Sequence, residues 1–203
     1  MRIGIYGGTF DPVHYGHLAL AEHCREQARL DQVWFLPAGA PPHKRDHVIT
    51  DGKQRAEMLE FALAGLKEFV VDRREIKRPG PSYTVETLRE LHAEHPGHEF
   101  FFLLGGDSLF DFPTWREPKE IATLAPLVVV NRGQATLPPL DSLIPTLGPE
   151  NVARIQIVQM PGLEISSRDL RQRVQAGHSI RFLTPRAVEQ YIAHNHLYQT
   201  PRT

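Results

Sequence analysis

Short apolar runs alternate with stretches of helical periodicity along most of the chain of 203 residues. The runs expected to form buried strands are 3–6, 33–36, 69–71, 99–107, 127–130 and 154–159. Alternation of this kind predicts βαβ units, and therefore an α/β fold with a mainly parallel sheet and helices on both faces. Ligand sites in such sheets lie at the carboxyl ends of the strands.

Helices are predicted between these strands and after the last one. Residues 17–29, 51–66 and 84–94 carry helical patterns. Two further helices close the chain, one with Ser166 and Asp169 at capping-box spacing and one with Thr184 as N-cap before Pro185. We expect one domain over 1–203, with the C-terminal helices (about 166–198) packing on the same core, and a surface excursion over the Pro-, Leu- and Gly-rich residues 133–151.

The composition excludes several classes of protein. The formal net charge is −1, so no global basic field attracts nucleic acid. No apolar stretch approaches the roughly 18 residues that cross a membrane. Cys24 is the single cysteine, which excludes an internal disulfide, and its helical spacing predicts a packed core thiol. We therefore expect a cytoplasmic protein without a membrane or nucleic-acid partner.

Unusual residues gather after the predicted strands. They are Gly7-Gly8-Thr9, Pro41-Pro42-His43-Lys44, Gly105-Gly106-Asp107, Asn131-Arg132 and Ser166-Ser167. Because the carboxyl ends of parallel strands meet at one edge of a sheet, these residues are expected to form one site.

The first of these segments favours an anion. Gly7 and Gly8 allow a ligand to approach the backbone closely, and a helix that begins near Gly16 points its positive end toward the same space. His14 and His17 can donate hydrogen bonds to phosphate oxygens. Neither G-x-G-x-x-G nor G-x-x-x-x-G-K-[ST] is present, so a phosphate site here is built differently. A simple turn and a surface histidine pair are the alternatives.

Two motifs carry a family resemblance. The stretch "GGTFDPVHYGH" resembles the signature of the nucleotidyltransferases with an H-x-G-H motif, here His14–His17. The stretch "ISSRDLR" at 165–171 resembles their second motif, I-S-S-T-x-I-R, with Arg168 in place of the usual Thr. The segments at 37–44, 81–88, 103–115, 129–132 and 191–198 extend this similarity over nearly the whole chain, to the bacterial nicotinate mononucleotide adenylyltransferases.

The resemblance implies a Rossmann-like, doubly wound fold of the nucleotidyltransferase type and a defined reaction. ATP and nicotinate mononucleotide would give nicotinate adenine dinucleotide and pyrophosphate, in NAD biosynthesis. The mononucleotide phosphate would attack the α-phosphorus of ATP in line, which needs positioning and charge stabilisation more than an enzyme nucleophile. Magnesium would bridge the ATP phosphates and water, with no ligands from protein side chains.

The resemblance also implies roles for individual residues. The catalytic residues are expected to be His14, His17, Lys44 and Arg171. The ATP site is expected to include Gly7, Gly8, Thr9, Phe10, Gly105, Asp107, Ser166 and Ser167. The mononucleotide is expected to contact Tyr83, Thr84, Trp115 and Arg132, with the ring stacked on Trp115 and the carboxylate at the helix start formed by Tyr83 and Thr84.

Other interpretations of these residues stay open at this point. Trp115 could only cover the core, Asp107 could only cap a helix, and 41–44 could be a stiff exposed loop. The basic residues of 73–78 are interpreted as a solvated edge or an assembly contact, and a homo-oligomer is left open. Two other functions compete: an adenylyltransferase for another phosphorylated acceptor, such as phosphopantetheine, and a nucleotide-binding regulator without turnover.

Overall fold

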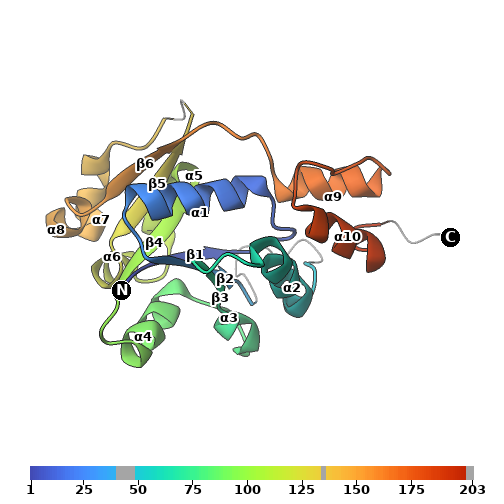
Figure 1. Ribbon diagram of the computed structural model, residues 1–203. Helices are drawn as coiled ribbons and strands as arrows, with labels where there is room; N and C mark the ends of the chain where they lie inside the picture. Colours follow the sequence, from blue (N-terminus) through green and yellow to red (C-terminus); the bar gives the residue numbers. More distant parts are fainter. Residues whose placement is uncertain (40–48, 134–135, 200–203) are drawn as a thin grey trace.

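A sheet of six parallel strands forms the centre of the protein, as shown by a computed structural model (Figure 1). The residues described are 1–39, 49–133 and 136–199. The strands are β1 (Arg2–Gly8), β2 (Gln32–Pro37), β3 (Phe69–Val71), β4 (Glu99–Gly105), β5 (Leu127–Arg132) and β6 (Gln156–Met160). Every pairing is parallel, and the order is β3-β2-β1-β4-β5-β6. The predicted α/β fold is confirmed.

Helices cover both faces of the sheet. The longer ones are α1 (Tyr15–Gln27), α2 (Gly52–Leu63), α4 (Thr84–Glu94), α6 (Pro118–Leu124), α9 (Ser167–Gln175) and α10 (Arg186–His194). The shorter helical segments are α3 (Arg74–Lys77), α5 (Gly106–Asp111), η1 (Phe112–Thr114), η2 (Leu140–Leu143), α7 (Ile144–Leu147) and α8 (Pro149–Val152). Among the described residues, no helix combines the length and apolarity needed to cross a membrane; the cytoplasmic location stays a prediction.

Alternation along the strands divides the core into two clusters. On β4, Phe101 and Leu103 face one cluster, while Phe100, Phe102 and Leu104 face the other. The first cluster includes residues of α1, α2, α9 and α10, and the second includes residues of α4, α5, α6, α7 and α8. A strand with apolar residues on both faces is the pattern of a parallel sheet buried between two helical layers.

The order of the strands creates a crevice. From β1, the strands β2 and β3 follow one another toward one edge of the sheet. The chain then crosses over, and β4 pairs with the other side of β1. The connections after β1 and β4 therefore leave the sheet in opposite directions, and the space between them is the usual ligand site of a doubly wound fold. Of the residues predicted to bind ATP, 7–10 lie at the end of β1 and just after it, and Gly105 and Asp107 lie at the end of β4 and just after it.

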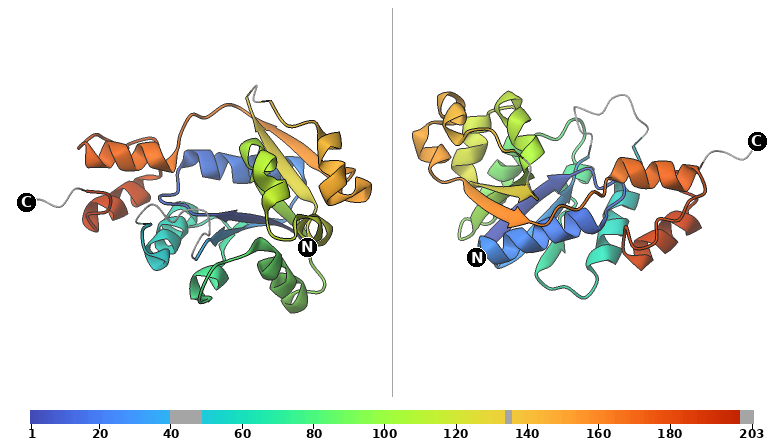
Figure 2. Two further views of the ribbon diagram at one scale, coloured as in Figure 1. Left: turned by 180° about the vertical axis from the view of Figure 1, so that it is seen from behind. Right: turned by 90° about the horizontal axis from the view of Figure 1, so that it is seen from above.

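The C-terminal helices α9 and α10 extend beyond the sheet on the side of α2 (Figures 1 and 2). Leu170, Val188 and Ile192 are fully or almost fully buried and belong to the same cluster as Leu20 of α1 and Met58 of α2. Ser166 caps α9, since its hydroxyl accepts a hydrogen bond from the Asp169 amide at 3.1 Å.

The start of α10 differs from the prediction by one residue. Pro185 is the N-cap and the helix begins at Arg186. The Thr184 hydroxyl caps nothing here, because it donates to the carbonyl oxygen of Val13 at 2.7 Å. The Thr184 side chain, which the local sequence pattern predicted to cap the helix, instead makes a tertiary hydrogen bond.

Residues 133–151 are not simply a surface excursion. Within the described part, η2 and α7 bury Leu143 and Leu147 in the second cluster. Helices of a single turn show no periodicity in a sequence, and Pro145 and Pro149 lie in the first turns of α7 and α8, where proline is tolerated. Both prolines lie at helix starts, in a segment for which the sequence analysis expected a surface excursion.

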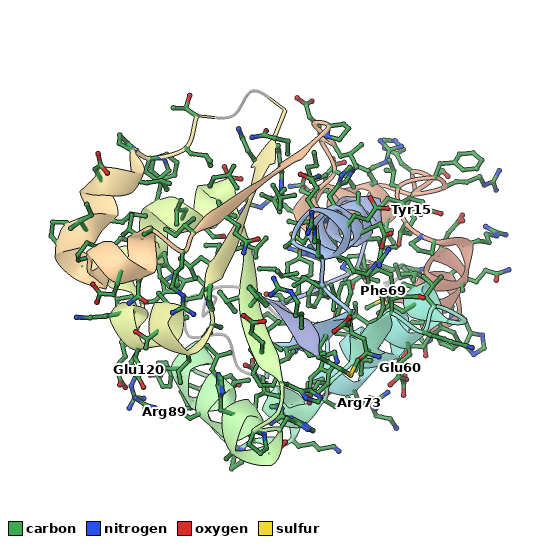
Figure 3. All side chains as sticks on the ribbon, turned by 60° about the vertical axis from the view of Figure 1, so that its left-hand side comes forward. Tyr15, Glu60, Phe69, Arg73, Arg89 and Glu120 are labelled. Atoms are coloured by element: carbon green, nitrogen blue, oxygen red, sulfur yellow. The ribbon has the colours of Figure 1, made fainter. Side chains whose placement is uncertain are left out.

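The structure also changes the interpretation of the basic residues of 73–78. Arg73 pairs with Glu60 at 2.7 Å, and the two side chains lie together in Figure 3. Arg74, whose side chain is 15% exposed, pairs with Asp72 at 2.7 Å and Glu94 at 2.9 Å. Arg73 and Arg74 therefore hold α3 against α2 and α4, whereas Lys77 is exposed. An assembly contact at these residues stays a prediction.

The close approach of β1 to its neighbours gives a test of the core. A Cβ atom on Gly4 would lie 2.7 Å from Leu30 Cδ1 and 3.1 Å from Leu103 Cδ1. We expect Gly4→Ala to lower the free energy of unfolding by about 1–3 kcal/mol, because the extra methyl group overpacks the core. Gly97→Ala is the control, since a Cβ at Gly97 meets nothing within 4 Å. Equal urea midpoints for the two variants would contradict this packing.

Candidate functional site

A cavity of about 710 Å³ opens at the crevice. Its lining includes Gly7 and Gly8 at the end of β1, Thr9 after β1, Ala38 after β2, and the start of α4 with Tyr83 and Thr84. Phe102 of β4 and Trp115 also line it. The cavity has the volume of a nucleotide-sized ligand site, within the 300–1,000 Å³ typical of such sites.

The loop between β1 and α1 is held by side chains from distant segments. Four of its main-chain carbonyl groups accept from such side chains: Thr9 from Arg55 at 2.8 Å, Asp11 from Arg171 at 2.7 Å, Pro12 from Ser167 at 2.9 Å and Val13 from Thr184 at 2.7 Å. Buried carbonyl groups require partners, and this loop lies outside the strand and helix ladders that would supply them. The loop is therefore rigid because α2 and the C-terminal helices hold it.

The two histidines of the H-x-G-H motif stack on each other. Their ring centroids lie 3.7 Å apart with an interplanar angle of 23°. The main-chain N–H of His14 donates to Nδ1 of His17 at 3.3 Å. Because Nδ1 of His17 accepts this bond, we assign the proton of the neutral ring to Nε2, which makes that nitrogen a donor.

His14 is buried, and its pKa is lower than that of a free histidine. Its side chain is 5% exposed, and Nδ1 has no hydrogen-bond partner among the described residues. Burial, and to a lesser extent the positive charge of Arg132, together lower the pKa of His14 from 6.5 to about 4. The ring is thus neutral at pH 7 without a ligand, and an anion beside it would oppose both causes.

Two glycines give the aromatic rings their space. A Cβ on Gly16 would lie 3.0 Å from Cε1 and Nδ1 of His14, and a Cβ on Gly8 would lie 2.8 Å from the ring of Phe10. Phe10 itself has a positive φ of 48°. The Gly-Gly turn and the central Gly of the motif are therefore needed for the positions of Phe10 and His14, besides any contact with a ligand.

The residues expected to bind the mononucleotide are partly brought together. Tyr83, Thr84 and Trp115 all line the cavity. Thr84 is the first residue of α4, a helix of 11 residues. The Trp115 ring packs edge-on against Phe102, with centroids 5.9 Å apart, and is half-buried. An aromatic face and a helix N-terminus thus share one cavity, although their roles there stay predictions.

Arg132 lies elsewhere. Its Nη2 atom would be 3.2 Å from a Cβ on Gly105, and it is absent from the lining of the cavity. Its Nε atom is buried and has no hydrogen-bond partner among the described residues. Asp107, in the first turn of α5, is exposed. Arg132 is therefore next to residues expected to bind ATP rather than next to Tyr83 and Trp115.

The second motif supports the loop. Ser167 and Arg171 donate to the carbonyl oxygens of Pro12 and Asp11, and Ser166 caps α9. Their expected contacts with the ATP tail stay predictions, as do those of Gly7, Gly8, Thr9 and Phe10. Lys44, the remaining expected catalytic residue, lies outside the described residues, as do Pro41, Pro42 and His43.

The sequence analysis missed four residues of the site. Glu75 and Arg116 line the cavity, and Asp11 and Arg55 lie behind the loop. Glu75 is 8% exposed, accepts from the Thr87 hydroxyl at 2.8 Å, and has a pKa raised by burial. The Arg116 guanidinium lies 4.5 Å from the centroid of the Tyr83 ring. Of these four residues, Asp11 lies inside the motif "GGTFDP", and this position could have identified it as a residue of the site.

Comparisons with known proteins agree with this geometry. The profile of the cytidylyltransferase-like family matches residues 5–173. A protein of Roseiflexus sp. called "probable nicotinate-nucleotide adenylyltransferase" is 47% identical, over 97% of this chain and 98% of its own. One of Thermomicrobium roseum with the same name is 44% identical, over 98% and 92%. The chain belongs to the nicotinate-nucleotide adenylyltransferases of the cytidylyltransferase-like family.

Membership of this family confirms the resemblance carried by His14–His17 and by residues 165–171. Solved structures agree on the fold. The Plasmodium falciparum nicotinic acid mononucleotide adenylyltransferase complexed with NaAD has a TM-score of 0.78 and 19% identity, covering 97% of both chains. At this identity the likeness supports the Rossmann-like nucleotidyltransferase fold alone.

The lowered pKa of His14 predicts a pH dependence of stability. Between pH 6.5 and about 4 the unfolded state binds a proton that the folded state does not, so the free energy of unfolding falls as the pH falls through this window. One pKa unit corresponds to about 1.4 kcal/mol, so His14 contributes a loss of up to about 3 kcal/mol.

We expect His14→Asn to remove this part of the loss, as measured by urea unfolding at pH 7.5, 6.5, 5.5 and 4.5. His178→Asn, at an exposed histidine, is the matched control and should keep the wild-type slope. An unchanged slope in His14→Asn would mean that another group causes the acid sensitivity.

Proposed function

We propose that this protein is a nicotinate-nucleotide adenylyltransferase, which joins ATP and nicotinate mononucleotide to form nicotinate adenine dinucleotide and pyrophosphate. The observation that carries the proposal is the cavity shared by the loop after β1 and the start of α4. It offers an anion-binding loop at one side and an aromatic ring with a helix N-terminus at the other. The names of relatives at 44–47% identity support the same activity.

In the proposed reaction, a phosphate oxygen of the mononucleotide attacks the α-phosphorus of ATP. A new P–O bond forms, the bond between the α-phosphorus and the bridging oxygen breaks, and pyrophosphate leaves. The attacking oxygen is already ionised, so no protein base is required. The tasks left to the protein are alignment of the two phosphates and stabilisation of negative charge.

His14 and His17 fit the second task. His17 presents Nε2 as a donor, since Nδ1 is engaged by the main chain. His14 has an unsatisfied ring nitrogen, and a triphosphate beside it would raise its pKa and favour a second N–H donor. Removing one such donor from a transition state costs about 2.7–4 kcal/mol. Lys44 and Arg171 are proposed to add positive charge at the same phosphates.

Magnesium is proposed to enter with ATP. Among the described residues, no group of three or more His, Cys, Asp or Glu side chains could hold a metal ion, whereas buried nitrogen atoms of His14 and Arg132 lack partners. This donor set fits the oxygen atoms of a phosphate rather than a cation. The ion would be bound by ATP oxygens and water, and would offset phosphate charge during the transfer.

The pyridine ring is proposed to stack on Trp115, with its carboxylate at the amide groups of Tyr83 and Thr84. Backbone N–H groups at a helix start favour an anion over a neutral amide. The Arg116 guanidinium, near the Tyr83 ring, adds positive charge to the same part of the cavity.

The activity is tested by pyrophosphate release with ATP and Mg²⁺ and three alternative acceptors. We expect kcat/KM for nicotinate mononucleotide to exceed that for nicotinamide mononucleotide by at least tenfold, with no release from phosphopantetheine. A preference for phosphopantetheine would keep the reaction class and overturn the acceptor. No release with any acceptor would favour a nucleotide-binding protein without turnover.

The stacking role has its own test. Trp115→Ala should raise the KM for the mononucleotide about tenfold, because base–aromatic stacking is worth about 1–3 kcal/mol, and should leave the KM for ATP within about twofold. Trp34→Ala, at the other tryptophan of the chain, is the matched control, since Trp34 does not line the cavity. A change confined to the KM for ATP would mean that Trp115 contacts ATP and not the mononucleotide, which contradicts the stacking role.

A further inference from the structure

Within 1–39, 49–133 and 136–199, the largest fully buried side chain is an arginine that lies directly behind the cavity. Arg55, on α2, is 1% exposed. Its Nε donates to the carbonyl oxygen of Thr50 at 2.8 Å, Nη1 to that of Thr9 at 2.8 Å, and Nη2 to that of Ala38 at 2.6 Å. A buried guanidinium satisfied by main-chain carbonyl groups acts as a bracket between segments.

The segments joined by Arg55 are walls of the site. Thr9 follows β1 and Ala38 follows β2, and both line the cavity. Thr50 precedes α2. Arg55 itself does not line the cavity, so it reaches the substrates only through the main chain of Thr9 and Ala38. Ala38 also lies shortly before the 40–48 segment, which carries Lys44.

A second buried group supports the arginine. Asp11, which is 4% exposed, accepts from the Tyr198 hydroxyl at 2.6 Å and from the Thr50 amide at 3.4 Å. Burial lowers the pKa of Arg55, and the negative charge of Asp11 opposes this shift. Tyr198 lies near the end of the chain and has a positive φ of 62°. The C-terminal segment thus supports the carboxylate that balances the charge of Arg55.

Lysine would not replace this arginine. A guanidinium offers five N–H donors in a rigid plane, and three of its nitrogen atoms are used here in three directions. An ammonium group keeps the charge but is a compact point donor, so it cannot span the same carbonyl groups.

We propose that Arg55 is a positioning residue of the adenylyl transfer, which fixes the loop after β1 relative to the loop after β2. This inference rests on the proposed function. It predicts an effect on the rate of the chemical step rather than on binding, because the arginine touches neither substrate and sets the alignment of the groups that do. A misplacement of about 1 Å at such a site costs about 10²-fold in rate.

The chain offers a matched control. Arg2 donates from Nη2 to the carbonyl oxygen of Ala28 and from Nε to that of Arg29, both at 3.2 Å, and pairs with Glu99. It is also a bracket between segments, but it lies at the amino end of β1, opposite to the cavity. Arg55→Lys and Arg2→Lys therefore make the same chemical change at the two ends of one strand.

The experiment measures kcat, both KM values and the thermal midpoint for wild type, Arg55→Lys and Arg2→Lys. We expect kcat of Arg55→Lys to fall by about 10- to 100-fold with KM values within about threefold, and kcat of Arg2→Lys to stay within twofold of wild type. A folded Arg55→Lys with kcat within twofold of wild type would overturn the proposal. Equal losses of kcat in both variants would also overturn it, since they would indicate a general loss of structure.

If Arg55→Lys does not fold, Tyr198→Phe tests the positioning role of Arg55 instead. It removes only the hydroxyl that contacts Asp11 and leaves no buried charge without a counter-charge. We then expect kcat to fall several-fold while the thermal midpoint stays near that of wild type, and an unchanged kcat counts against the proposal. Wild-type protein that releases no pyrophosphate would overturn the proposed function itself, and with it the catalytic consequence for Arg55, whereas an active wild type confines any failure to Arg55.

Discussion

The site depends on how the main-chain carbonyl groups between residues 9 and 13 are satisfied. This loop leaves the sheet at the strand-order switch and is partly buried, so its polar groups need partners that neither β1 nor α1 provides. The partners are side chains of α2, α9 and the residue before Pro185: Arg55, Arg171, Ser167 and Thr184. An unsatisfied buried carbonyl costs about 1–3 kcal/mol, so the loop and its supports stabilise one another.

This arrangement explains why the C-terminal helices belong to the working protein. Leu170, Val188 and Ile192 bury their side chains in the cluster beneath α1 and α2. From that position the polar residues of the same segment reach the loop that carries His14. The hydrophobic cluster thus stabilises the packing of α9 and α10, and the hydrogen bonds fix the position of the loop after β1. The stacked pair His14 and His17 stays ordered because both the loop before it and the helix after it are fixed.

The electrostatics of the site favour a ligand that brings negative charge. His14 is held neutral by burial and by Arg132, and polar nitrogen atoms of both residues lack partners among the described residues. Such atoms are costly in a folded protein unless something else satisfies them. A triphosphate would supply acceptors for these donors and offset the positive charge, so binding and catalysis would use the same residues.

The sequence by itself determined the strands, the two helical layers and the family, because apolar alternation fixes which segments are buried and "GGTFDPVHYGH" fixes which turn follows β1. It also predicted that Tyr83, Thr84 and Trp115 share a site. Only the tertiary structure decided the hydrogen-bond partners of Arg55, Asp11 and Tyr198, the separation of Arg132 from Trp115, and the short helices within 133–151. The physical reason is that periodicity reports burial, whereas the partner of a polar side chain depends on which distant carbonyl group comes within about 3 Å of it after folding.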